Sequence, residues 1–512
     1  MNKLKFIGCY GILALAAVSF SACSNDDNNE DNGGGNNGGG TANIVWTTDG
    51  NFDACNHILF TKDGKDNVSD DGKQIGSGDQ NFVFNGKQTL AKGTYELKGW
   101  VYIAKGAELT IEKGSIIKGD SATQAAIIVE PGGKLIAKGD AQNPIVFTSE
   151  QPAGQRRPGD WGGVIICGNG PKNGAEQQIE GGPRTKFGGG TADANDNSGI
   201  LSYVRIEFAG YPFQKDKEIN GLTLGAVGAG TQIDHVQVSY SNDDSFEWFG
   251  GNVNAKYLIA YKGWDDDFDT DNGFSGHVQF ALSVRDPRIA DSSMSNGFES
   301  DNDANGSTAT PFTQAVFSNV TFVGPKATAK AQGETFVNDK SYITAGNMRP
   351  KNTSALGRFQ AAMQIRRNSH LNCFNSVAVG WPVGLIIEND KGSTTQDAAG
   401  KDFFINNVWF CDMDAVGRDA NKKLDEPVDK NAFSYKFFLA QDGNKYNESY
   451  ADLFDAKTLW LPSANSALLK AAAWTNAKLS DWFQRVDYVG AFAAGDNWTE
   501  GWTNFDPENA KY

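Results

Sequence analysis

The sequence predicts an all-β protein built as a β-solenoid, a single stack of short strands wound into coils. Two observations lead to this prediction. Coils of nearly equal length follow one another, because Gly106 and Gly132 are 26 residues apart at equivalent turns and Leu109 and Leu135 keep the same spacing. Further along, a phenylalanine followed by a carboxylate recurs. Repeats of this length bury their apolar side only by stacking on their neighbours.

The recurring phrase follows an apolar alternating run each time. It occurs as Phe246-Glu247, Phe268-Asp269 and Phe298-Glu299, with spacings of 22 and 30 residues. Equivalent positions of adjacent coils stack about 4.8 Å apart, and neighbours along a strand point to opposite sides. We therefore expect the three phenylalanines to form an inward stack and the three carboxylates to form an outward column.

The chain opens on a segment that predicts export. Residues 1–22 combine two early lysines with an apolar run that falls short of the roughly 20 residues of a membrane span, and they read as a lipoprotein signal peptide. The small residues before Cys23 resemble a bacterial lipobox, which implies cleavage there and lipidation of Cys23. An ordinary signal peptide with a chance cysteine is the alternative.

Residues 23–42 are too polar and glycine-rich to fold, and they predict a disordered tether. Their acidic cluster resembles the signal that sends lipoproteins of Bacteroidetes-type bacteria to the outer face of the outer membrane. That resemblance implies a lipid-anchored protein exposed at the cell surface.

The folded part divides into three segments. Residues 43–92 predict an N-terminal cap, residues 93–412 the solenoid, and residues 413–512 a C-terminal cap that folds back over the last coils. Within the cap, the alanine and leucine spacing of residues 464–479 predicts a short helix. Three late coils share an Asn/Ser pair before a valine, as in Asn375-Ser376, and this position suits a ladder of stacked side-chain amides.

Charge and cysteine content exclude some functions. The net charge is −16, from 46 Lys+Arg and 62 Asp+Glu, which argues against a nucleic-acid partner. The cysteines of the folded part are dispersed and match no metal motif. They are Cys55, Cys167, Cys373 and Cys411. We expect buried free thiols at Cys167 and Cys411, although an exported protein permits disulfides.

The coil pattern is similar to the right-handed parallel β-helix of the pectin-lyase-like superfamily, over residues 93–412. Together with the lipobox, the phrases around Asp243-Asp244 and Trp264-Asp265 resemble those of β-helical outer-membrane lipoproteins. Such relatives accompany TonB-dependent transporters, so the resemblance implies capture of a ligand at the surface. Fold alone does not transfer a function.

The acidic stretch between residues 231 and 306 is the expected ligand site. Its candidate ligand-binding residues are carboxylates of the repeated phrases and one neighbouring tryptophan. They are Asp243, Asp244, Glu247, Trp264, Asp266, Asp267, Asp269 and Glu299. Carboxylates this close must share protons, bind a cation or fan into water. Trp248, Trp264 and Tyr261 offer faces for stacking a glycan, and the alternative is that these rings belong to the core.

A calcium ion, structural in role, is the expected cofactor. The segment from Asp301 through Asp303 to Asn305 matches the start of a calcium loop, but the twelfth position, Phe312, is not glutamate. The sequence thus favours a surface lipoprotein that binds a glycan, a cation or another nutrient. A glycoside hydrolase or lyase that uses the clustered acids is the alternative.

Overall fold

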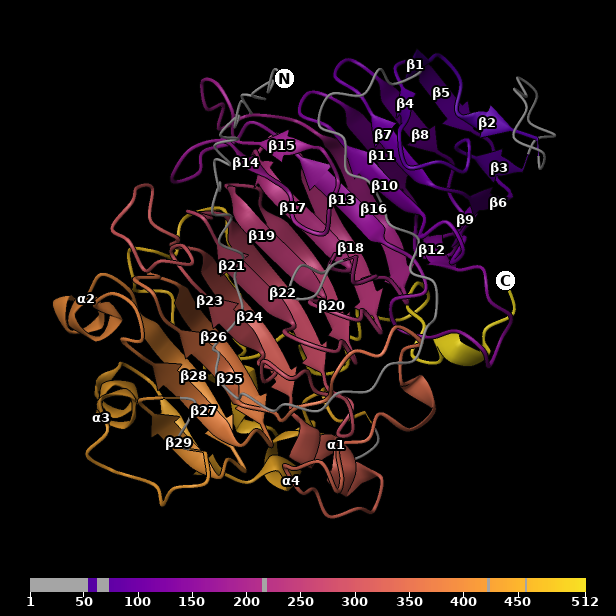
Figure 1. Cartoon of the computed structure of the whole chain (residues 1–512). Coiled ribbons are helices and arrows are strands. Elements are labelled where there is room, and N and C mark those ends of the chain that lie inside the picture. The colour runs from indigo at the N-terminus through magenta and orange to yellow at the C-terminus, as the bar shows by residue number, and fades with distance from the viewer. Residues whose placement is uncertain (1–53, 62–72, 214–218, 421–423, 456–457) are drawn as a thin grey trace, which may run out of the picture.

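A computed structural model of the chain provides the structure described here, shown in Figure 1. It describes residues 54–61, 73–213, 219–420, 424–455 and 458–512. The predicted signal peptide, Cys23 and the tether lie outside the described residues. Among the described helices, none has the length and apolar character needed to cross a membrane.

Two long sheets, here named A and B, form the body of the protein (Figure 1). The strands of sheet A, in spatial order, are β1 (Ala54–Cys55), β4 (Phe82–Phe84), β7 (Trp100–Ile103), β10 (Ala126–Val129), β13 (Gly163–Cys167), β17 (Leu222–Val227), β19 (Phe246–Gly251), β21 (Phe268–Asp271), β23 (Phe298–Ser300), β25 (Ala361–Ile365), β27 (Val383–Ile387) and β29 (Ala415–Arg418). Every neighbouring pair in this sheet is parallel.

Sheet B runs beside it through the same coils. Its main path is β2 (Leu59–Phe60), β3 (Gln74–Ile75), β6 (Thr94–Leu97), β9 (Ile116–Gly119), β12 (Ile145–Ser149), β16 (Gly199–Glu207), β18 (Gln232–Ser239), β20 (Ala255–Tyr261), β22 (His277–Val284), β24 (Val316–Val323), β26 (Asn372–Val379), β28 (Ile405–Cys411) and β30 (Lys445–Glu448). Beside this path lie β5 (Lys87–Leu90), β8 (Glu108–Ile111) and β11 (Lys134–Lys138).

Because the chain alternates between the two sheets and neighbours within each are almost all parallel, the structure is a parallel β-helix, as predicted. In the early coils sheet B consists of two separate strands, and from β16 on they join into one bent strand. β11 pairs with the first half of β16, and β12 with the second half. The β-helix is longer at both ends than the predicted span, since β1 and β4 precede it and β29 and β30 follow it.

A residue with positive φ makes the bend in each long strand of sheet B, and these residues stack. In the middle coils they are the rings of Tyr203, His235 and Tyr257, whose centroids are 4.1 and 4.4 Å apart. In the late coils they include Asn375 and Asn407, and Asn407 Nδ2 donates to Asn375 Oδ1 at 2.8 Å. The predicted amide ladder is therefore confirmed between these two coils. In the third coil, Asn319 Oδ1 accepts instead from Gln279 Nε2 at 3.1 Å.

Part of the C-terminal segment covers the last coils, because its helix α3 (Phe433–Ala440) buries Phe437 and Phe438 in the main core. The chain that follows does not stay at this end. It runs back along sheet B, and at its end Tyr512 donates to the carboxylate of Glu207 on β16. Figure 1 places the C-terminus beside β12 accordingly. The helix predicted at residues 464–479 is absent, and only a 3₁₀ turn at Ala467–Lys470 forms. The physical reason is that Asn375 accepts the N–H of Ala473 and donates to its carbonyl, which holds this backbone extended.

Short helices lie in the connections between strands. They are α1 (Pro325–Ala331), α2 (Thr394–Gly400), α3 (Phe433–Ala440) and α4 (Tyr450–Leu453), with 3₁₀ turns at Gly346–Met348, Ala467–Lys470 and Pro507–Asn509. A small antiparallel hairpin of β14 (Gln177–Gln178) and β15 (Lys186–Phe187) follows β13. The cysteines at 55, 167, 373 and 411 are free, and Cys167 and Cys411 are buried as predicted.

Candidate functional site

The three repeated phrases lie in register on neighbouring strands of sheet A. Phe246 pairs with Phe268, and Phe268 pairs with Phe298. Their rings point into the β-helix, with centroids 5.6 and 5.9 Å apart along the stack. The predicted phenylalanine stack is confirmed, and the same register places a carboxylate column on the opposite side of the sheet.

The carboxylate column is Glu247, Asp269 and Glu299, and it does not face solvent as expected. These residues are only 3%, 4% and 6% exposed. The sequence argument correctly found the outward side of the sheet, but it had no means of knowing that loops cover that side. Of the three outcomes open to crowded carboxylates, spreading into water is thereby excluded for this column.

Part of the cover is the loop between β13 and β16. Its residues Ile179 and Phe187 are buried against Phe249, which follows Glu247 by two positions on β19. Figure 1 shows the β14–β15 hairpin of this loop beside β13 and β17. The loop also brings Glu180 near Glu247, and burial, followed by the charge of Glu180, raises the pKa of Glu247 well above its ordinary value.

A second ladder borders the column at the start of the same strands. Asp244 Oδ1 accepts the backbone N–H of Asp266 at 2.7 Å, and the Asp266 carboxylate accepts the N–H of Asn296. Asn296 Oδ1 in turn accepts the N–H of Ala361 at 3.1 Å. One oxygen of each carboxylate thus holds the next coil in place, which is a structural reason for aspartate at these positions.

In this part of sheet A, two groups of three carboxylates lie close enough to hold a cation, and Asp244 belongs to both. In the first, ligand atoms of Asp244, Glu247 and Asp269 lie within 4.8 Å of one another. In the second, the same holds for Asp243, Asp244 and Asp265. Among the described residues, no ion pair involves Asp244, Glu247 or Asp269, and Asp269 Oδ1 is buried without a hydrogen-bond partner.

Electrostatics explain why this arrangement is unfavourable without a counter-ion. Burial, followed by the charges of Asp243 and Asp266, raises the pKa of Asp244 well above its ordinary value. Burial and then Glu299 raise the pKa of Asp269 in the same way. Since burial disfavours the charged form and like charges add to the cost, these carboxyl groups must take up protons or a cation.

Two of the predicted ligand-binding residues lie elsewhere. Asp267 is fully buried in an ion pair with Arg285, in which Arg285 Nη1 is 2.8 Å from Asp267 Oδ1. Trp264 is 0% exposed and packs in a second apolar cluster with Trp409 and Trp502, so it offers no face to a glycan. Trp248 and Tyr261 are buried as well. The core interpretation of these rings was correct.

The predicted calcium loop is not assembled as a ligand set. Asp301 pairs with two arginines, Arg366 Nε at 2.9 Å and Arg367 Nη1 at 2.8 Å. Asp303 instead accepts the N–H groups of Asn305 and Ser307 within its own turn. Because the Asp301 carboxylate is already neutralised, the sequence match reflects a turn and a buried ion pair.

The arginines of this network were missed by sequence reasoning. Arg366 also pairs with Glu299, so the downstream end of the carboxylate column is neutralised by protein charge. Gln364, in register with Glu299, donates to Glu388. The sequence does contain a pattern that could have revealed these arginines. Gln364 and Arg366 occupy the same strand positions as Glu299 and Asp301, one coil later. The phrase there has Met363 in place of phenylalanine, which hides the repeat.

One cleft adjoins the acidic cluster, and another lies apart from it on sheet B. One of about 280 Å³ is lined by Gly159, Asp160, Tyr211, Lys351 and Asn352 among others. It adjoins the acidic cluster, because Asn242, which precedes Asp243, donates to Ser354 Oγ at 3.1 Å and lies against Gly159.

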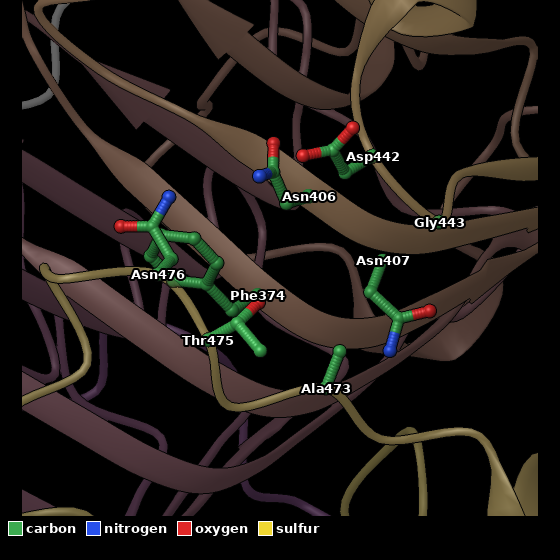
Figure 2. Close-up of a pocket in the computed structure, with 8 residues that line it drawn as sticks. All are labelled: Phe374, Asn406, Asn407, Asp442, Gly443, Ala473, Thr475 and Asn476. Atoms are coloured by element: carbon green, nitrogen blue, oxygen red, sulfur yellow. The ribbon is translucent and has the colours of Figure 1, made fainter.

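The other cleft, of about 240 Å³, lies on sheet B beneath the C-terminal segment (Figure 2). Polar side chains dominate its lining, which comprises Phe374, Asn406, Asn407, Asp442, Gly443, Ala473, Thr475 and Asn476. It belongs to late coils and to the returning chain, and so it is separate from the carboxylate column on sheet A.

A protein-family model agrees with this architecture. The crystal structure of pectate lyase Pel9A is similar, with 13% sequence identity and a TM-score of 0.40, over 77% of this chain and 89% of that chain. Curated protein sequences gave no match. The family model described as the pectate-lyase-like β-helix domain matches residues 83–503. The match spans most of the sequence, and the chain belongs to the pectate-lyase-like β-helix family.

Proposed function

We propose that the protein binds a divalent cation of the calcium type at Asp244, Glu247 and Asp269, and uses it to bind an acidic polysaccharide. The observation that carries the proposal is the convergence of three buried carboxylates on neighbouring coils, with Asp269 Oδ1 unpartnered among the described residues. A buried polar atom without a partner costs free energy, so it marks a place where a ligand is expected.

The residues present fit such an ion. Calcium takes six to eight oxygen ligands, and carboxylates are the hard donors it prefers. Three carboxylates supply part of that shell and leave positions for water or for ligand oxygens. When bound, the ion would supply positive charge to a site whose protein ligands carry only negative charge. Arg366 is committed to Glu299 and Asp301, and within the described part of the chain no ion pair reaches Asp244, Glu247 or Asp269.

The ligand would approach from the half-buried Asp243 and the adjoining cleft. That cleft offers a lysine ammonium at Lys351, a phenol at Tyr211 and an amide at Asn352, a set that suits hydroxyl and carboxylate groups of a sugar. Membership of a pectate-lyase-like family makes an acidic plant polysaccharide the first ligand to test. The sequence features around Cys23 support placing this activity at the cell surface, on a lipid anchor and beside a TonB-dependent transporter.

A polysaccharide-degrading enzyme is the second candidate, and one observation favours it. Burial raises the pKa of both Glu247 and Asp269, and a carboxyl group with a raised pKa is what a general acid requires. A pair of carboxylates is also the minimum for glycoside hydrolysis. The fold by itself does not choose between binding and cleavage.

Binding of polygalacturonate to the purified full chain, measured with calcium and with a chelator, tests the proposal. We expect retardation in an affinity gel only with calcium, and its loss in Asp269→Asn. The matched control is Asp303→Asn, which keeps the turn that Asp303 caps and should bind normally. Retardation that persists in the chelator would contradict the proposal. New reducing ends or unsaturated products, abolished by Asp244→Asn, would instead establish the enzyme.

A further inference from the structure

The second group of carboxylates, at Asp243, Asp244 and Asp265, needs an explanation of its own. Its ligand atoms lie within 4.8 Å of one another, as in the first group, and Asp244 is common to both. A cluster of acidic side chains alone does not make a site. The second observation is that Asp265, only 6% exposed, has its Oδ1 buried without a hydrogen-bond partner among the described residues.

The hydrogen bonds around Asp265 do not satisfy its charge. Its other oxygen, Oδ2, lies 2.7 Å from the hydroxyl of Ser293, which is also 2.9 Å from Asp291 Oδ2. A serine hydroxyl has one proton and donates to one of these carboxylates at a time. Asp291 accepts the N–H of Ser293 as well, whereas Asp265 has no other donor among the described residues.

Among the described residues, the cation whose charge acts on Asp265 is Arg285, and it is already committed. Arg285 Nη1 lies 2.8 Å from Asp267 Oδ1 and 2.6 Å from the backbone carbonyl of Asp265, and its Nη2 is 3.3 Å from the carbonyl of Trp264. None of these contacts reaches the Asp265 carboxylate. A single divalent ion at the first group would balance part of the charge there and leave Asp265 Oδ1 unpartnered among the described residues.

We propose that the cluster holds two divalent cations, the second bound by Asp243, Asp244 and Asp265 and joined to the first through the shared carboxylate of Asp244. This inference rests on the proposed function for the first ion. Carboxylate-bridged pairs of ions in proteins are about 3.5–4 Å apart. Asp244 suits a bridging role, because its Oδ1 accepts the backbone N–H of Asp266 and its Oδ2 accepts no hydrogen bond from the described residues.

Counting bound ions tests the inference, with calcium as the probe in calorimetry of the chelator-treated full chain. We expect two ions in the wild type and one in Asp265→Asn, which removes the second group alone. One ion is also expected in Glu247→Gln, which removes the first group alone. Asp244→Asn, which affects both groups, should bind at least tenfold more weakly. Asp303→Asn serves as the control and should bind two.

Manganese in place of calcium gives a readout of distance. Two Mn²⁺ ions joined by one carboxylate couple magnetically, so the wild type should give a broadened electron paramagnetic resonance spectrum, and Asp265→Asn the six-line spectrum of an isolated ion. If the wild type binds one ion and Asp265→Asn also binds one, the inference is overturned but the first site is retained. Asp265 is then protonated and does not bind an ion. No bound ion at all would overturn the proposed function itself.

Discussion

Replacing Asp269 by asparagine should have opposite effects on the protein with and without its cation. Burial and the neighbouring carboxylates raise the pKa of Asp269 in the folded state. The folded state therefore holds this proton more tightly than the unfolded chain, and the cation-free protein loses stability as pH rises above the unfolded value of about 3.9. Asparagine does not titrate, so the variant should keep the stability that the wild type loses.

The size of the effect follows from linkage. Each unit by which the folded pKa is raised costs about 1.4 kcal/mol once the pH exceeds it. At pH 7 this cost cannot exceed about 4 kcal/mol. That is the free energy needed to keep a carboxyl group protonated when its pKa in the unfolded chain is about 3.9. In chelator, Asp269→Asn should thus raise the free energy of unfolding by about 1–4 kcal/mol at pH 7, and change it little near pH 4.

Calcium should reverse this order of stability, so that the wild type becomes more stable than Asp269→Asn. An ion at 100 times its dissociation constant stabilises the folded state by about 2.7 kcal/mol, and a variant that has lost a ligand gains less. Urea denaturation followed by tryptophan fluorescence gives the free energy of unfolding. The wild type and the variant are each measured at both pH values, with calcium and with chelator. The reasoning would be refuted if Asp269→Asn destabilised the chelated protein at pH 7, because the carboxylate would then be favourable without an ion. Asp303→Asn should follow the wild type throughout.

Three further predictions address the scaffold and the anchor. Asn375→Ala removes the partner of both backbone groups of Ala473 and one of the two hydrogen bonds that Asn407 Nδ2 donates, so urea denaturation should show a loss of about 3 kcal/mol. Arg366→Met leaves the buried Glu299 without its ion-pair partner and Asp301 with Arg367 alone, and should cost about 3–5 kcal/mol by the same measurement. Arg358→Met, at an exposed ion pair, should cost under about 1 kcal/mol. Cys23→Ala should move the protein from the membrane fraction to the soluble fraction; continued membrane association would contradict lipidation.

The coils were predictable because their signal is periodic and local. Phe246, Phe268 and Phe298 repeat at the length of one coil, so their register follows from the sequence alone, and the paired strands have that register. The amide ladder was predictable for the same reason, since asparagine tolerates the positive φ that the bend at Asn375 requires.

The aperiodic parts were not predictable. The alanine-rich segment before Leu479 has good helix propensity, but Asn375, about a hundred residues earlier, takes both hydrogen bonds of Ala473 and keeps it extended. Propensity is a weak prior that such tertiary contacts override. Trp264 precedes its strand, where no alternation indicates its direction, and nothing in the sequence distinguishes a stacking ring from a core ring.

Burial of the carboxylate column couples the proposed function to stability. In a solenoid the coils alone would leave the outer side of a sheet in water, where three carboxylates would cost little. Here the loop carrying Phe187 and the neighbouring connections exclude water from Glu247 and Asp269, so the same residues become costly unless an ion or protons balance them. A counter-ion bound as proposed would then stabilise the loops as well as occupy the site. It follows that loops added to a plain coil, and not the coil itself, make this face of the protein a candidate site.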